Sequence, residues 1–137
     1  QLLPDGRMFV GWGTLPYFSE FAADGTLVAD GQIAETCQSY RAFSSDWTGH
    51  PAEPPVAAAR RRPGGGSRVY ASWNGATSVA AWTVLAGPSA SSLSGVGTFR
   101  RTGFETAMTV HHRASHIAVE PRNAAGHVLA RSAPVRL

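Results

Sequence analysis

Histidine is the residue of this sequence with the widest range of chemistry, and three of the five histidines, His111, His112 and His116, lie close together. A metal site needs two or three imidazoles that converge on one point, with further groups that orient them. Adjacent side chains of a β-strand point to opposite faces, so His111 and His112 cannot both bind one ion on a regular strand. We therefore predict a polar loop of the fold here and no metal site.

The two remaining histidines, His50 and His127, lack the surroundings of a catalytic group. A histidine that attacks an electrophile must be unprotonated, and the charged oxygens of the reacting group need cationic or hydrogen-bonding partners. His50 lies in a proline-rich stretch and His127 follows a turn glycine. Neither has an acidic or basic residue near it in the sequence that is arranged to influence the protonation of its imidazole. The sequence also has no Ser-His-Asp order, phosphate-binding loop or closely paired carboxylates. We predict that this chain alone is not catalytic and uses no cofactor.

Three residues of the first half are candidates for ligand binding: Trp12, Tyr17 and Arg41. Trp12 stands between two glycines, which let a ligand or a neighbouring backbone come close to a strand. If this strand lines the central channel of a β-propeller, Tyr17 and Arg41 could face that channel too. A guanidinium is suited to a sulfate or a carboxylate. The alternative is packing between neighbouring sheets for Trp12 and a solvated surface position for Arg41.

Composition excludes several classes of protein. The chain has 137 residues, 43% of them hydrophobic, which suffices for a real core. All twelve basic residues are arginine, but the net charge is only +3, and the arginines form a single cluster, at residues 60–62. A surface that follows the phosphates of a nucleic acid needs a dense basic stripe, so we expect no nucleic-acid partner. That cluster is expected to prevent a further strand from pairing with an edge strand, or to contact a neighbouring domain. One cysteine excludes an intrachain disulfide and a cysteine zinc site.

Residues 69–99 carry no charge, which is compatible at first sight with a membrane segment. Asparagine, serine, threonine and a Gly-Pro pair interrupt this stretch, so it contains no span of about 20 mainly apolar residues. We read it as uncharged β-structure and expect no membrane span. The chain begins with glutamine and has no basic-then-apolar leader, so we expect a processed chain or a fragment.

The first 48 residues have the pattern of one β-propeller blade. Asp-Gly pairs at residues 5–6 and 24–25 predict turns, and a third pair at residues 30–31 predicts a bulge within a strand. Strands are expected at residues 8–13 (MFVGWG), 17–22 (YFSEFA), 26–33 (TLVADGQI) and 38–47 (QSYRAFSSDW). Four short consecutive strands are typical of one blade, which has two apolar faces and needs neighbouring blades for stability.

The second half has the pattern of an immunoglobulin-like sandwich. Residues 49–55 are rich in proline and predict a stiff linker. Seven short strands are expected after it, at residues 56–61, 68–73, 79–86, 95–102, 104–111, 116–121 and 127–137. Seven strands at this spacing are typical of such a sandwich. The predicted fold is thus all-β: a propeller blade-like segment (1–48), a linker (49–55) and an immunoglobulin or fibronectin III-like β-sandwich (56–137).

Residues 117–135 (IAVEPRNAAGHVLARSAPV) resemble the last hairpin of fibronectin type III domains, with an alternating strand, an Asn-x-x-Gly turn and a Ser-x-Pro exit. Trp73 falls where that family has a core tryptophan on its second strand. Ile117 falls where the family usually has tyrosine, so the hydrogen bond of the tyrosine corner is expected to be missing.

The whole chain resembles the C-terminal end of bacterial arylsulfotransferase-like proteins. The resemblance rests on motifs that occur in order: residues 3–6 (LPDG), 10–13 (VGWG), 16–20 (PYFSE), 38–41 (QSYR), 51–55 (PAEPP), 72–76 (SWNGA) and 85–88 (LAGP). It implies a secreted or cell-envelope protein in which a β-propeller precedes a fibronectin-like module. It also implies sulfuryl transfer from an aryl sulfate ester to a phenol through a histidine nucleophile, without a nucleotide sulfate donor.

The resemblance places the catalytic histidine and its arginine and histidine partners in earlier blades, which this chain does not contain. We therefore expect a non-catalytic, structural C-terminal fragment whose partners are the missing blades, with the aryl sulfate and phenol bound by the parent protein. The alternative is a stand-alone β-sandwich module that binds a protein or a carbohydrate.

Overall fold

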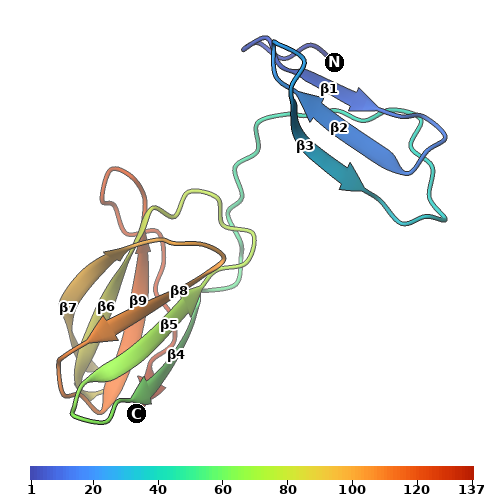
Figure 1. The fold of residues 1–137 in the computed structure, drawn as a ribbon. Helices are drawn as coiled ribbons and strands as arrows, with labels where there is room; N and C mark the ends of the chain where they lie inside the picture. The colour runs from blue at the N-terminus through green and yellow to red at the C-terminus, as the bar shows by residue number, and fades with distance from the viewer. The chain divides into compact units, whose positions relative to one another are not determined.

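A computed structural model describes residues 1–137, and the chain is all-β with antiparallel pairing throughout. It divides into two compact units, Gln1–Asp46 (unit 1) and Trp47–Leu137 (unit 2). Figure 1 shows a three-stranded sheet in unit 1 and a two-layered β-sandwich in unit 2. The structure contains no helix long and apolar enough to cross a membrane.

Unit 1 is an antiparallel meander of β1 (Met8–Gly11), β2 (Tyr17–Phe21) and β3 (Leu27–Gln32). The β2–β3 turn uses Gly25 at a φ of +85°, a conformation in which glycine avoids the Cβ clash of other residues. The sequence predicted these three strands. Side chains alternate along each strand, so the sheet has two faces, and the antiparallel register places the residues of the three strands on one face or the other.

The fourth strand predicted for residues 38–47 is wrong, because this segment contains no strand. The edge of β1 is already occupied: the Gln1 and Phe9 backbones exchange two hydrogen bonds, each of 2.8 Å. The segment is tied to the same side of the sheet, where the Gln1 side-chain amide donates to the Ser44 carbonyl and accepts from its N–H. The outer edge of β3 is therefore left without a neighbouring strand.

The bulge predicted at residues 30–31 is also wrong. The register shift falls between Glu20 and Phe21, and Gly31 pairs regularly with Phe18. A Cβ added at Gly31 would lie 2.2 Å from the Cζ atom of Phe18, so the glycine makes room for the aromatic ring and not for a turn.

Unit 2 is a sandwich of a three-stranded and a four-stranded sheet. The order is β4-β5-β8 in one sheet and β10-β9-β6-β7 in the other. Lettered A, B, C, C′, E, F and G along the chain, with no strand D, the strands form an ABE sheet and a GFCC′ sheet, as in immunoglobulin-like sandwiches. The strands are β4 (Val56–Arg61), β5 (Ser67–Ser72), β6 (Ala81–Ser89), β7 (Ser92–Arg100), β8 (Glu105–Val110), β9 (His116–Arg122) and β10 (Val135–Arg136).

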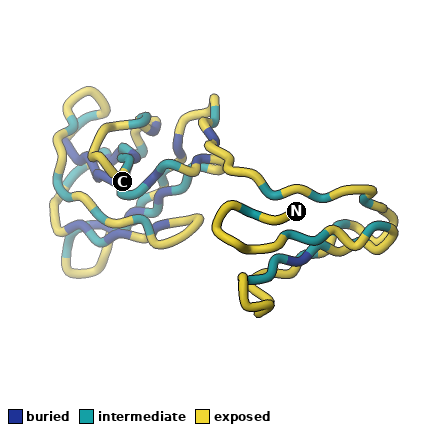
Figure 2. The backbone as a smooth tube through the Cα atoms, turned by 90° about the horizontal axis from the view of Figure 1, so that it is seen from above, coloured by how far each residue is buried: buried dark blue, intermediate teal, exposed yellow.

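The core of unit 2 lies between its two sheets. The three-stranded sheet contributes Val69 and Met108, and the four-stranded sheet contributes Trp82, Val84 and Ile117, all of them 1% exposed or less. Figure 2 shows the buried positions gathered in this unit. Trp82 lies inside this core, whereas Trp73, expected in the core from the fibronectin resemblance, is only half-buried and packs against the edge of the cluster.

Residues 49–55 pack on unit 2 and are not a free spacer. The Gly49 N–H donates to the Thr77 hydroxyl at 3.0 Å, and the Trp73 Nε1 donates to the Glu53 carbonyl at 2.7 Å. The last predicted strand, residues 127–137, shrinks to β10 (Val135–Arg136). Ahead of it, Ser132 holds the chain to β9 through a backbone hydrogen bond of 3.0 Å to the Val119 carbonyl.

Candidate functional site

The structure brings two of the three predicted ligand-binding residues together. Trp12 follows the last residue of β1, and its N–H donates to the carbonyl of Tyr17, the first residue of β2, at 3.2 Å. The two residues therefore form a cross-strand pair on one face of the sheet. We call this face the tryptophan face; its members are Met8, Val10, Trp12, Tyr17, Ser19, Phe21, Leu27, Asp30 and Gln32.

A chain of hydrogen bonds runs across the tryptophan face. The Trp12 Nε1 donates to the Ser19 hydroxyl at 2.8 Å, and that hydroxyl donates to the Asp30 carboxylate at 2.6 Å. Ser19 is 4% exposed and Trp12 is 46% exposed, so a buried hydroxyl fixes an indole whose ring is open to contact. The sequence pointed to Trp12 but not to Ser19 or Asp30. Ser19 alternates with Tyr17 and Phe21 along β2, which was a usable signal that it shares their face.

The glycines beside Trp12 have different roles. A Cβ at Gly11 would lie 2.8 Å from the Cβ of Ala42, so this glycine allows the chain after β3 to lie close to β1. Gly13 has open space around it and a φ of +67°, which serves the turn between β1 and β2. The expected close approach of a backbone therefore occurs at Gly11 only.

Arg41 lies elsewhere in unit 1. Its guanidinium lies over the ring of Tyr40, 5.4 Å from the ring centre, and no hydrogen bond or ion pair joins it to Trp12 or Tyr17. Arg41 lines a shallow groove of about 340 Å³ together with Phe9, Gly11 and Phe43. Both Arg41 and Tyr40 are exposed, so the guanidinium remains free for an anion.

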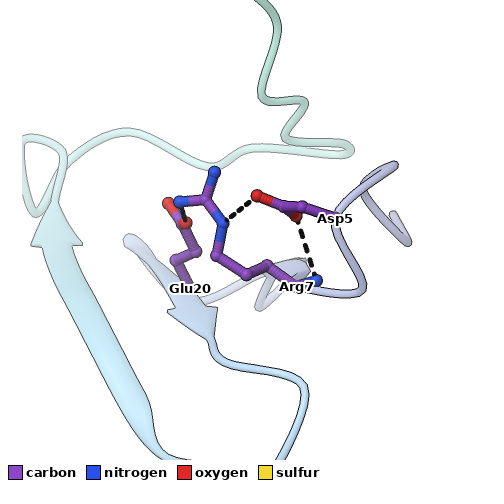
Figure 3. A network of polar contacts seen from close by, with 3 residues as sticks. All are labelled: Asp5, Arg7 and Glu20. Atoms are coloured by element: carbon purple, nitrogen blue, oxygen red, sulfur yellow. Dashed lines mark hydrogen bonds and ion pairs between the residues drawn. The ribbon is translucent and has the colours of Figure 1, made fainter.

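The other arginine of unit 1, Arg7, forms ion pairs with two carboxylates. Figure 3 shows Arg7 between two carboxylates: its Nε donates to Asp5 at 2.6 Å, and its Nη1 donates to Glu20. The hydrogen bond from the Arg7 side chain lowers the pKa of Asp5, and the same contact raises the pKa of Arg7. This network fastens the first turn of unit 1 to β2, and it pairs the charge of Arg7 with two carboxylates.

The tryptophan face has the groups of a binding surface and not those of a catalytic centre. It offers an indole, the phenol of Tyr17 and aliphatic side chains, and its one aliphatic hydroxyl, on Ser19, already accepts one hydrogen bond and donates another. All five histidines lie in unit 2, from His50 onward. A serine without a neighbouring base is a weak nucleophile, so this face has no group prepared for covalent catalysis.

The histidines of unit 2 do not form a site. His111 and His112 are exposed in the segment that follows β8, and His116 is half-buried at the start of β9. No group of three or more histidine, cysteine, aspartate or glutamate side chains is placed to hold a metal ion.

Comparison with known proteins gives no relative for this chain. No protein-family model matches it, and neither the curated proteins nor the solved structures give a significant match.

Proposed function

We propose that the chain is the C-terminal part of an arylsulfotransferase-like protein that is secreted or belongs to the cell envelope. In this proposal unit 1 is a propeller sheet that packs against neighbouring sheets of the parent protein, and unit 2 is a fibronectin type III-like module. The chain alone is structural and non-catalytic, and the aryl sulfate and phenol bind to the parent protein. The ordered motifs of the sequence support this assignment.

The single observation that carries the proposal is that unit 1 has no core of its own. Every buried hydrophobic side chain of the structure lies in unit 2, and the only buried residue of unit 1 is Ser19. Met8 and Leu27 of the tryptophan face are 47% and 55% exposed. A sheet with apolar side chains must bury them against another layer, and few-stranded sheets without such a layer are marginal in water.

The opposite face of unit 1 is apolar as well. Phe9 and Phe18 lie on it with their ring centres 5.6 Å apart, and both rings are only partly buried. A sheet with aromatic groups on both faces is the pattern expected of a blade, which has a neighbour on each side. This two-sided character supports a stack of sheets over a simple two-layer fold.

The experiment that tests the proposal is hydrogen exchange on the full chain, which reads both units in one molecule. We expect amides of β2 and β3 to exchange with opening free energies well below those of β6 and β9, whose amides stay protected. Unit 2 thus serves as the internal control. The alternative, a stand-alone module that binds a protein or carbohydrate partner, requires unit 1 to be self-sufficient. Protection of β2 and β3 equal to that of β6 and β9 would establish that alternative.

A second measurement addresses catalysis. The full chain is incubated with a chromogenic aryl sulfate and phenol, and release of the aryl alcohol is followed against a buffer control. We expect no release above the control, because unit 1 lacks a histidine and the histidines of unit 2 do not converge. Saturable, phenol-dependent release would show that this chain contains a complete active site.

A further inference from the structure

The small net charge of the chain conceals two units of opposite charge. Unit 1 has two arginines against six acidic residues, which gives −4. Unit 2 has ten arginines against three glutamates, which gives +7. Only one ion pair occurs in unit 2, between Arg122 and Glu120 at 3.7 Å, so most of its arginines have no carboxylate partner.

Two of these arginines face each other on the outer surface of the three-stranded sheet. Arg60 of β4 and Arg68 of β5 are direct partners in the antiparallel register. They lie on the outer face because Val69 and Ala71, the alternate positions of β5, belong to the core. Cross-strand partners have Cβ atoms about 5 Å apart, and like charges at such positions destabilise a sheet.

Both guanidinium groups are held in place by uncharged neighbours. The Nη1 of Arg68 donates to the Thr109 hydroxyl at 2.7 Å, and the guanidinium of Arg60 lies over the ring of Tyr70, 5.9 Å from its centre. Glu105 is the only carboxylate of this outer face, and it lies four residues along β8 from Thr109, the register partner of Arg68, a distance of roughly 13 Å. The repulsion within the arginine pair is therefore not neutralised within the protein.

The pair belongs to a longer basic groove. Arg61, Arg62 and Pro63 complete a hollow of about 520 Å³ around Arg60 and Arg68. Arg61 also lines an adjoining hollow together with His112 and Arg113. Two hollows that share Arg61 are thus lined by five arginines. We call these residues, 60–62, 68 and 113, the arginine groove.

We propose that the arginine groove binds a polysaccharide that carries repeated sulfate or phosphate groups, with one such group held between Arg60 and Arg68. A tetrahedral oxyanion accepts paired N–H donors from guanidinium groups, and its charge removes the repulsion between the two side chains. The further arginines suit additional groups on the same polymer. This inference does not depend on the assignment of unit 1 as a propeller sheet.

The groove favours a carbohydrate polyanion over a nucleic acid. Proteins that hold single-stranded nucleic acid stack its bases on free aromatic rings, and recognition of a duplex uses an element that enters a groove. The one aromatic ring of the arginine groove, that of Tyr70, lies under the Arg60 guanidinium. The groove lies on a flat sheet face with no protruding helix, so it offers charge without a means to contact bases.

The test uses the full chain and measures binding of dextran sulfate, with uncharged dextran as the blank. We expect Arg60→Ala/Arg68→Ala to weaken binding at least tenfold and to reduce the slope of log K against log salt by about two. Arg131→Ala/Arg136→Ala is the matched control, because it removes the same charge from exposed positions of unit 2 outside the groove. This control is expected to weaken binding less than threefold.

The outcomes separate the possible ligands. Equal losses in the two double variants would overturn the proposal, since binding would then follow bulk charge. Inorganic sulfate that binds as tightly as dextran sulfate, per sulfate group, would show that a small oxyanion is the ligand and would overturn the polymer assignment. Tighter binding of a DNA oligonucleotide of equal charge would overturn the carbohydrate class. Circular dichroism of each variant establishes that the sandwich is folded before binding is measured.

Discussion

Replacing Ser132 by alanine is expected to destabilise unit 2 well beyond the effect of losing one surface hydroxyl. Ser132 is 5% exposed, and its hydroxyl accepts a hydrogen bond of 3.0 Å from the Val119 N–H and donates one of 3.0 Å to the Ala133 carbonyl. Val119 is fully buried in β9, so the substitution leaves its N–H without a partner. A buried donor left unsatisfied costs roughly 1–3 kcal/mol.

The assay is thermal and urea unfolding followed by tryptophan fluorescence, to which the buried Trp82 contributes. A loss of this size lowers the Tm of a domain of this length by roughly 4–20 °C. The control is Ser94→Ala, because Ser94 is exposed on β7 and makes no side-chain hydrogen bond, so it should change stability by less than about 0.5 kcal/mol. Hydrogen exchange at the Val119 amide gives a second reading. A stability of Ser132→Ala equal to that of the control would refute the reasoning.

Two further predictions concern unit 1. Gly31→Ala forces a methyl group into the Phe18 ring and is expected to lower the free energy of unfolding of unit 1 by roughly 1–3 kcal/mol. The loss would be seen in the dispersed amide resonances of β3. Gly95→Ala is the tolerated control, because its Cβ would meet nothing closer than 3.7 Å. The pKa of Asp5 is lowered by its hydrogen bond from Arg7, so this contact stabilises unit 1 above pH 3.8, the ordinary pKa of aspartate, and the benefit is lost as the pH falls through the lowered pKa. Protection of the Arg7 amide, measured as its exchange rate relative to the intrinsic rate at each pH, should therefore fall as the pH drops through the lowered pKa. Asp5→Asn should abolish that pH dependence of protection, and an unchanged protection profile in the variant would contradict this account.

Local alternation predicted the sandwich well because each of its strands buries one face. Val69 and Ala71 alternate along the expected strand at residues 68–73, and both are buried. Trp82 and Val84 alternate along the expected strand at residues 79–86 and are buried as well. The all-β class follows from these patterns and from the absence of helical periodicity.

The parts that could not be predicted depend on pairings between distant residues. The chain over residues 38–47 alternates like a strand, but the pairing of Gln1 with Phe9 already occupies the edge of β1. Local pattern carries no information about which edge is taken.

The arginine groove shows the same limit. The sequence displayed the run at residues 60–62, but only the hairpin register places Arg68 opposite Arg60. The ligand-binding roles of Trp12, Tyr17 and Arg41 remain predictions, and the structure joins the first two on one face.

The opposite charges of the two units have a practical consequence for purification. If a protease cleaved the chain between Asp46 and Trp47, it would release one fragment of −4 and one of +7. At neutral pH an anion exchanger would retain the first fragment and a cation exchanger the second, although the intact chain has an isoelectric point near 9.8. Chromatography of a digest would therefore report where the polypeptide is cut, and each half could be recovered without an affinity tag.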